Sequence, residues 1–241
     1  MTKIIAHRGA SKYAPENTMP AFELAYKMKA EGIETDVHLT KDRIPVLIHD
    51  SHVKRTTNGR GFIKDYYYEE LQKLDAGSWF SSEFSGTSII SLQNFLEWAN
   101  DKSLYLNIEL KNSRIDYKNI ESIVYEMIEH YSLLNRTTLS TFNHDSVERM
   151  KPLREKIGVA LLTSRKRKDL IWYTKGLGAN AIHINYRLLS KSLVQKCKEE
   201  NMKIRVYTVN KFVHIMRSFF AECDGVITDV PNKALRYRNI L

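Results

Sequence analysis

The chain has 241 residues, of which 43% are hydrophobic, 10 are glycines and 5 are prolines, and its formal net charge is +9. This composition excludes a disordered or fibrous protein, and the length suits one large domain whose core needs no disulfide bonds. The two cysteines, Cys197 and Cys223, form no disulfide framework, and neither a signal peptide nor a membrane-spanning segment is recognisable. We therefore expect a cytoplasmic protein without stable membrane association.

The positive charge is compatible with an anionic partner, and the sequence pI is about 9.4. The densest basic run, residues 164–168, lies where a helix should begin, and we interpret it as a solvated surface segment. No nucleic-acid-binding motif accompanies it. The sequence therefore predicts a small anionic ligand and no nucleic acid partner.

Short apolar segments rich in β-branched residues alternate with amphipathic segments. The expected strands span residues 3–8, 33–39, 44–50, 104–110, 137–142, 157–163, 181–185, 203–209 and 224–229. Helices are expected at 19–32, at about 116–131, from Asn143 onward and between the later strands, with none after the last strand. If 44–50 pairs with 33–39 as a hairpin, eight strands remain, which predicts a (β/α)8 TIM barrel; a doubly wound open sheet is the alternative.

Residues 51–90 interrupt this alternation between the second and third barrel strands. The segment is rich in Gly, Ser, Asn and aromatic residues, with one short helix signal at 68–74. We predict a single catalytic barrel domain over residues 1–241 with a small insertion at about 51–90, because long loops in compact domains are usually functional. The aromatic residues of the insertion either form its own core or line an exposed apolar rim.

Three carboxylates are expected at one end of the barrel, where the carboxyl ends of parallel strands meet. Glu34 and Asp36 are two residues apart on one strand and point to the same side, and Glu109 ends the neighbouring strand. Three such charges repel one another unless a cation neutralises them, and their hard oxygen ligands suit Mg²⁺ or Ca²⁺, with Mn²⁺ as a further option. For Glu34 and Asp36, salt bridges to Lys or Arg are the alternative.

Two histidines and two cations are expected at the same end. His7 and His49 follow apolar strands, and imidazoles can exchange the roles of general base and general acid near neutral pH. Arg8 and Lys111 supply positive charge suited to a phosphate group. The combination predicts phosphoryl-transfer chemistry.

Further polar residues near the strand ends have less certain roles in the sequence. Asn17 either caps a helix or donates a hydrogen bond beside the metal or the phosphate, and Tyr207 either lines the pocket or packs. Gly9 is expected to let the backbone turn close to the ligand. Asp229 is expected to cap the turn that follows it and not to ligate the metal, and Asp50 to orient a neighbour or to bind backbone.

An ordered series of motifs runs from residue 5 to residue 231. It comprises AHRGA…APENT, ETDVHLTKDRIPVLIHD, RTTNGRG, LDAGSW, LNIELK, LSTFN, VYTVN and DGVITDVP. This series resembles that of the glycerophosphodiester phosphodiesterase family. The resemblance implies a TIM barrel that hydrolyses small glycerophosphodiesters to an alcohol and sn-glycerol 3-phosphate with the help of one divalent cation.

The resemblance also implies roles for individual residues. They are metal ligation by Glu34, Asp36 and Glu109, acid–base catalysis by His7 and His49, and phosphate binding by Arg8 and Lys111. Three positions depart from the family pattern. Arg43 and Ile90–Ser91 stand where glycine and proline are common, and Tyr207 stands where tryptophan is frequent.

Other functions remain compatible with parts of the sequence. A lysophospholipase D or other phospholipase-type activity on the same barrel is the closest alternative and would use an apolar rim. A zinc amidohydrolase would need more histidines than this barrel end provides, since His183 is the single histidine on a late strand. A non-enzymatic phosphate binder would lack one of the catalytic groups. The sequence leaves open the headgroup, the order of the histidines, the nucleophile and the oligomeric state.

Overall fold

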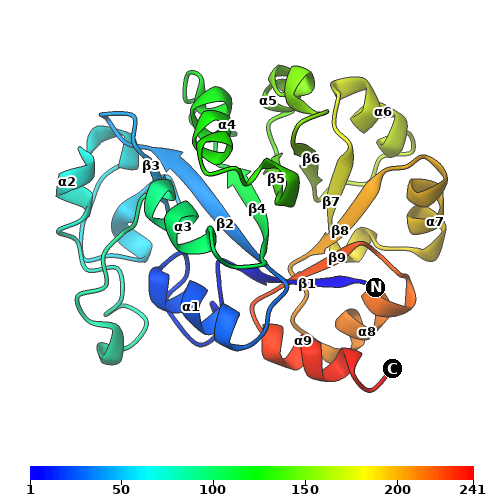
Figure 1. Ribbon diagram of the computed structural model, residues 1–241, viewed down its shortest axis with the longest axis horizontal. Helices are drawn as coiled ribbons and strands as arrows, with labels where there is room; N and C mark the ends of the chain where they lie inside the picture. The colour runs from blue at the N-terminus through cyan, green and yellow to red at the C-terminus, as the bar shows by residue number, and fades with distance from the viewer.

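The computed structural model describes all 241 residues and shows a closed barrel of parallel strands surrounded by helices (Figure 1). The barrel strands are β1 (Lys3–His7), β2 (Gly32–Leu39), β4 (Tyr105–Leu110), β5 (Thr137–Thr141), β6 (Gly158–Thr163), β7 (Ala181–Asn185), β8 (Lys203–Tyr207) and β9 (Gly225–Thr228). Strand β1 pairs with both β9 and β2, and this double pairing closes the sheet. The closure confirms the predicted TIM barrel and excludes the open sheet.

A ninth strand, β3 (Pro45–Leu47), lies outside the barrel and pairs antiparallel with β2, where Val37 faces Leu47. The predicted hairpin is therefore confirmed, although it is shorter than the apolar segment. Its turn contains Arg43 at φ 64°, in the left-handed region that glycine adopts most easily. Arg43 thus adopts a left-handed conformation at the position where the resemblance leads us to expect glycine.

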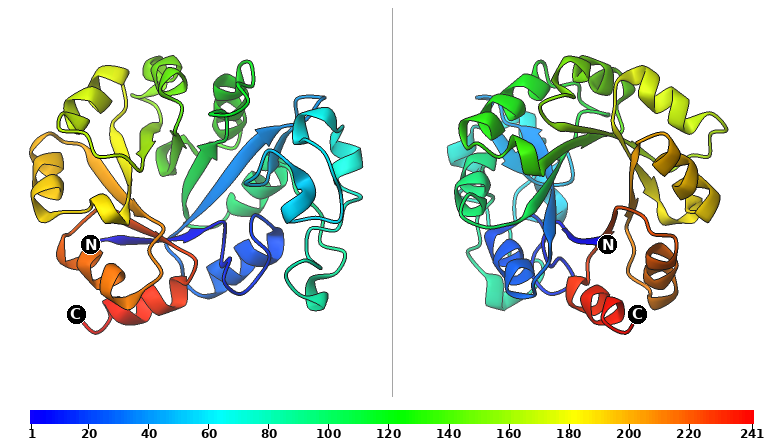
Figure 2. Two further views of the ribbon diagram at one scale, coloured as in Figure 1. Left: turned by 180° about the vertical axis from the view of Figure 1, so that it is seen from behind. Right: turned by 45° about the vertical axis from the view of Figure 1, so that its right-hand side comes forward.

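The helices surround the strands, as the right-hand view of Figure 2 shows. They are α1 (Met19–Lys27), α2 (Tyr68–Leu71), α3 (Leu92–Ala99), α4 (Ile120–His130), α5 (His144–Arg149), α6 (Leu170–Leu177), α7 (Lys191–Glu199), α8 (Phe212–Phe220) and α9 (Pro231–Arg238). The expectation of no helix after the last strand was wrong. Helix α9 is mostly polar and buries only Pro231 and Ala234, so its hydrophobic pattern is weak.

The apolar core lies between the barrel and its helices. Helix α1 contributes Phe22, whose ring centroid lies 4.7 Å from that of Phe95 on α3. Helix α3 begins with a capping box, in which Ser91 Oγ accepts a hydrogen bond from the Asn94 backbone nitrogen at 3.1 Å. This cap starts the helix without the proline that the resemblance leads us to expect at this junction.

Residues 51–90 fold against the outside of β3 and contain α2 and three short 3₁₀ helices (Figure 1). Their small core joins the side chains of Val46, Ile48, Val53, Ile63, Leu71, Ala76 and Ile89. Both expectations for the aromatic residues hold in part. Tyr66 and Tyr68 pack on this core, whereas Phe62, Tyr67 and Trp79 are exposed.

None of the helices is both long and apolar enough to span a membrane.

The interior of the barrel holds a buried pair of polar side chains. His183 on β7 and Arg205 on β8 are adjacent and buried, and Arg205 Nη1 donates a hydrogen bond to His183 Nε2 at 3.1 Å. Burial, followed by the charge of Arg205, lowers the pKa of His183 well below its usual 6.5. His183 is therefore a neutral hydrogen-bond acceptor in the folded protein.

This neutral histidine makes stability depend on pH. Because the pKa is lower in the folded than in the unfolded chain, the unfolded chain binds the extra proton as pH falls below 6.5. We expect His183 to remove roughly 1.4 kcal/mol from the free energy of unfolding per pH unit below that value. Urea unfolding of the wild type and of His183→Gln at pH 7.5 and 5.5 measures this contribution as the difference between the two pH dependences. Equal pH dependences would contradict it.

Candidate active site

The three predicted carboxylates converge at the upper end of the barrel, where the strands end. Glu34 and Asp36 come from β2 and are buried, and Glu109 lies opposite Asp36 on β4. One oxygen from each of the three carboxylates lies within 4.8 Å of the others. The structure therefore brings the three predicted ligands into one small volume.

The charges of this cluster oppose one another. Burial, then Asp36 and Glu109, raises the pKa of Glu34 well above its usual value, and burial and Asp36 also raise the pKa of Glu109. Burial acts in the same direction on Asp36, but Arg8 and Lys111 outweigh it and lower its pKa. Two of the three carboxylates are thus unfavourable as anions without further positive charge.

The cluster fits a hard divalent cation. Asp36 Oδ1 is buried and accepts no hydrogen bond, although Lys111 Nζ lies 3.5 Å from it, so this ligand oxygen has a free lone pair for an ion. All three side chains offer carboxylate oxygens, the donors that Mg²⁺ and Ca²⁺ prefer. Glu34, Asp36 and Glu109 would hold such an ion.

Two cations contact the carboxylate cluster. Arg8 Nε lies 3.1 Å from Asp36 Oδ2, and Lys111 Nζ donates a hydrogen bond to Glu109 Oε1 at 2.7 Å. The backbone of Arg8 has φ 54°, in the left-handed region, and its N–H points at Glu34 Oε2 at 3.0 Å. The positive groups therefore lie at the edge of the proposed ion site, where a phosphate would meet them.

The first predicted catalytic histidine, His7, connects this cluster to a carboxylate on another strand end. His7 Nε2 lies 3.9 Å from Glu34 Oε2, and His7 Nδ1 is hydrogen-bonded to Asp229 Oδ1 at 2.6 Å. Asp229 also accepts hydrogen bonds from Ser11 and Asn210. The expectation that Asp229 caps the next turn was wrong, because its carboxylate faces the barrel mouth and orients His7.

We expect Asp229→Asn to lower kcat by about 100-fold, since an amide neither fixes the same imidazole tautomer nor stabilises a protonated ring. KM should change little, because Asp229 does not contact the carboxylate cluster. Steady-state kinetics measure both constants, and a shifted pH–rate profile distinguishes the loss of orientation from a structural defect. Asp229→Glu should recover part of kcat; an unchanged kcat in Asp229→Asn would contradict the role.

The second predicted catalytic histidine, His49, has a similar partner. His49 Nδ1 is hydrogen-bonded to Asp50 Oδ1 at 2.6 Å. Arg55 holds the other oxygen, with its Nε 2.7 Å from Asp50 Oδ2. Although burial opposes ionisation, these contacts lower the pKa of Asp50 to about 2. Asp50 thus orients its neighbour, as expected.

One residue of the first loop ties these groups together. Glu16 accepts hydrogen bonds from Arg55 at 2.7 and 2.9 Å and from Arg8 at 2.8 Å. Neither Glu16 nor Arg55 was among the predicted site residues. Glu16 lies in a turn and Arg55 ends a short 3₁₀ helix, so residue spacing gives no sign of their meeting. We call Glu16, Asp50 and Arg55 the clamp.

Asn17 holds one carboxylate of the cluster, that of Asp36, by a hydrogen bond. Its Nδ2 donates to Asp36 Oδ2 at 2.8 Å, and its Oδ1 accepts from Thr35 Oγ1 at 2.8 Å. Thr18, not Asn17, occupies the position before α1, so the structure shows the hydrogen-bonding alternative and not the cap.

Gly9 lies in the turn after β1, as expected, and its φ is 82°. A Cβ there would also lie 2.6 Å from the Ala21 carbonyl carbon. Gly9 therefore allows α1 to approach this loop closely.

A cavity of about 400 Å³ opens beside Glu109, and His49, Asp50, Lys111 and Phe142 are among the residues that line it. Tyr207 packs edge-on against Phe142, with their ring centroids 5.9 Å apart. Its hydroxyl is buried without a hydrogen-bond partner, and burial, then the charge of Glu109, raises its pKa. Tyr207 thus lies at the wall of the mouth.

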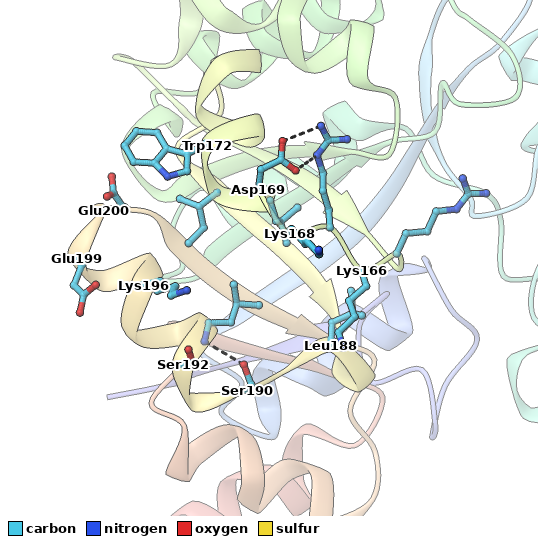
Figure 3. Close-up of a pocket in the computed structure, with 15 residues that line it drawn as sticks. Lys166, Lys168, Asp169, Trp172, Leu188, Ser190, Ser192, Lys196, Glu199 and Glu200 are labelled. Atoms are coloured by element: carbon cyan, nitrogen blue, oxygen red, sulfur yellow. Dashed lines mark hydrogen bonds and ion pairs between the residues drawn. The ribbon is translucent and has the colours of Figure 1, made fainter.

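A separate pocket of about 580 Å³ lies between α6 and α7 (Figure 3). The basic run contributes residues 165–168 to it, in the loop before α6, and Arg167 pairs with Asp169 at 2.8 Å. The pocket contains none of the predicted catalytic or ligand residues. It is therefore a second surface feature, outside the site at the strand ends.

Comparison with known proteins agrees with this geometry. The model of the glycerophosphoryl diester phosphodiesterase family matches residues 7–233. The chain is 40% identical over 241 residues to a glycerophosphodiester phosphodiesterase of Bacillus altitudinis, covering 99% of this chain and 98% of the relative. It is 39% identical over 230 residues to an enzyme of the same name from Caldanaerobacter subterraneus, covering 95% of each chain.

Solved structures give the same result. A phosphodiesterase of Oleispira antarctica in complex with the product sn-glycerol-3-phosphate is 28% identical and superimposes with a TM-score of 0.85, covering 99% of this chain and 97% of that one. The whole barrel is shared with these proteins. The chain belongs to the glycerophosphoryl diester phosphodiesterase family and is a phosphoric diester hydrolase.

Proposed function

We propose that this chain hydrolyses small glycerophosphodiesters to an alcohol and sn-glycerol 3-phosphate by acid–base catalysis at His7 and His49. One observation carries the proposal: two histidines, each held at Nδ1 by a carboxylate, lie with two cations around a buried carboxylate cluster. The name of the Oleispira antarctica structure supports the identity of the product.

Arg8 and Lys111 would bind the phosphodiester. Their charges lie beside Asp36 and Glu109, and guanidinium and ammonium groups both bind phosphate oxygens well. A divalent cation, Mg²⁺ or Ca²⁺, held by the three carboxylates would supply electrostatic stabilisation of charge that develops on the phosphoryl oxygens. Asn17 would keep Asp36 in place for that ion.

The hydrogen bonds at Nδ1 suggest how the protons move. A carboxylate that accepts from Nδ1–H leaves Nε2 of a neutral imidazole free to accept a proton. We assign His7 as the base, because its Nε2 faces the cluster, and His49 as the acid that protonates the leaving alkoxide. The nucleophile is water, or the 2-hydroxyl of the glycerol with a cyclic phosphate as intermediate.

We further propose that residues 1–241 work as one catalytic domain and that residues 51–90 cover one side of the substrate. Arg55 of this segment supports Asp50, and His52 lines the same cavity as His49. Tyr207 would form the opposite wall beside Phe142. The headgroup would therefore contact both the barrel and the insertion.

A coupled assay for glycerol 3-phosphate release tests the function. Chelator-treated enzyme receives Mg²⁺, Ca²⁺, Mn²⁺ or Zn²⁺ together with glycerophosphocholine, glycerophosphoethanolamine or glycerophosphoglycerol. Release restored by Mg²⁺ or Ca²⁺ is expected, and detection of a transient cyclic glycerophosphate would identify the 2-hydroxyl as the nucleophile. No release from any soluble diester would contradict the proposal.

A lysophospholipase D activity is the second candidate, and one contact favours it. Phe62 is 44% exposed and packs edge-on against His52 at the edge of the cavity, so an apolar side chain is available to an acyl chain. Turnover of lysophosphatidylcholine in place of the soluble diesters would select this candidate.

A further inference from the structure

A second cavity, of about 420 Å³, lies at the opposite end of the barrel from the carboxylate cluster. Tyr105, Gly158 and Lys203, which begin their strands, line it together with Arg205. We call it the lower pocket. It contains none of the residues assigned to catalysis.

Arg205 is the buried cation of the lower pocket, and no carboxylate pairs with it. Its residue is 8% exposed, and its one hydrogen bond runs from Nη1 to the neutral His183. The guanidinium carbon lies 4.5 Å from the centroid of the Tyr105 ring, and Nε has no partner. A buried charge of this kind needs a compensating group, since burial alone disfavours it strongly.

The neighbouring polar atoms are also unsatisfied. Because His183 Nε2 accepts from Arg205, Nδ1 carries the hydrogen and is a donor without a partner. The Tyr105 hydroxyl is a second buried group without a partner, and Asn107 Oδ1 is a third. Donors thus outnumber acceptors around a positive charge, which suits an oxyanion and excludes a metal cation.

The entrance of the lower pocket is positively charged. Four further cations line it, and a single carboxylate, Glu155, is paired with one of them; the cations are Arg136, Arg154, Lys156 and Lys203. A cavity lined mainly by one sign of charge concentrates ions of the opposite sign.

One glycine leaves space in the wall of the pocket. Gly158 and Thr138 both line it, and a Cβ at Gly158 would lie 2.3 Å from Thr138 Oγ1. A side chain at position 158 would therefore crowd Thr138 and fill part of the pocket.

We propose that the lower pocket binds a small tetrahedral oxyanion, inorganic phosphate or a phosphate monoester, through Arg205. This site is distinct from the catalytic phosphate position at Arg8 and Lys111, and it does not depend on the proposed function. The bound anion accepts hydrogen bonds from Arg205 and Tyr105, which both line the pocket, and compensates the buried charge.

Isothermal titration with inorganic phosphate tests the proposal in the variant Arg8→Gln/Lys111→Gln, which lacks the catalytic cations. At constant ionic strength, with chloride as the reference anion, we expect one phosphate per chain. Adding Arg205→Gln should weaken the binding at least about tenfold, as for a lost charged hydrogen bond, and Arg205→Lys should lie in between. Lys166→Gln, in the loop before α6, is the matched control. Added to the Arg8→Gln/Lys111→Gln background, it should leave the affinity for phosphate unchanged.

Further titrations distinguish free phosphate from a phosphate monoester and allow for unfolding of Arg205→Gln. Titration with glycerol 3-phosphate in the same background shows whether the site accepts a monoester as well as free phosphate. Lys156→Gln/Lys203→Gln changes only exposed entrance residues, so its weaker binding supports the site even if Arg205→Gln unfolds. No phosphate binding in the background, or binding as tight as that of the background in both Arg205→Gln and Lys156→Gln/Lys203→Gln, would overturn the proposal. The background lacks the catalytic phosphate ligands, so a failure of the proposed catalysis leaves these results unaffected.

Discussion

Replacing His7 or His49 with Ala is expected to lower kcat by about 10²–10⁴-fold, the usual contribution of a positioned acid or base. Both imidazoles are oriented by a carboxylate at Nδ1, so the protein fixes their geometry before the substrate arrives. Rates of glycerol 3-phosphate release measure the effect, and thermal unfolding of each variant shows whether the fold is retained. His144→Ala is the matched control, because His144 is exposed and contacts Tyr173, away from the cluster.

A substrate with an activated leaving group separates the two roles. p-Nitrophenolate leaves without a proton, so a diester of p-nitrophenol should restore much of the rate to His49→Ala but not to His7→Ala. The opposite result would reverse the assignment of acid and base. Retained activity toward unactivated diesters in both alanine variants would exclude the histidines from catalysis.

Neutralising one carboxylate of the cluster should strongly weaken the binding of a divalent cation, which is the second large effect we expect. We expect Glu34→Gln and Glu109→Gln each to weaken divalent-cation binding by at least about 100-fold, since even indirect supports of metal ligands contribute ten- to hundredfold. Calorimetric titration of chelator-treated protein with Mg²⁺, Ca²⁺ and Mn²⁺ measures this directly, independent of turnover.

Glu97→Gln is the matched control for the ion titration. Glu97 lies on the outside of α3, where it accepts hydrogen bonds from Gln93 and Tyr131, so Glu97→Gln should bind the ion as the wild type does. Activity that survives exhaustive chelation, or equal ion affinity in Glu34→Gln and the wild type, would show that the carboxylates are not the ligands.

The fold and the centre of the site could be predicted from the sequence because both follow from repeated local patterns. Alternating apolar strands and amphipathic helices define the barrel, and the carboxyl ends of its parallel strands meet at one end. Glu34, Asp36 and Glu109 therefore had to converge once their strands were recognised. Helix α9 was missed because its surface is largely polar.

The supports of the histidines were harder to predict for physical reasons. Asp229 precedes Pro231 by two residues, and that spacing is also typical of a helix start. Glu16, in a turn, and Arg55, at the end of a short 3₁₀ helix, are 39 residues apart, and only the three-dimensional path of the insertion brings them together. Contacts between loops follow no period that a sequence pattern can show.

The two histidines proposed for catalysis are held by structures of unequal stability. His7 ends a strand that pairs on both sides within the closed barrel, whereas His49 follows a three-residue strand on an antiparallel hairpin whose turn contains a left-handed arginine. Local opening requires least free energy where few strands pair, so the hairpin should open before the barrel does. Heating would then inactivate the enzyme reversibly at temperatures below its unfolding transition. Substrate bound against the clamp would stabilise the hairpin and reduce the difference between the inactivation temperature and the unfolding temperature.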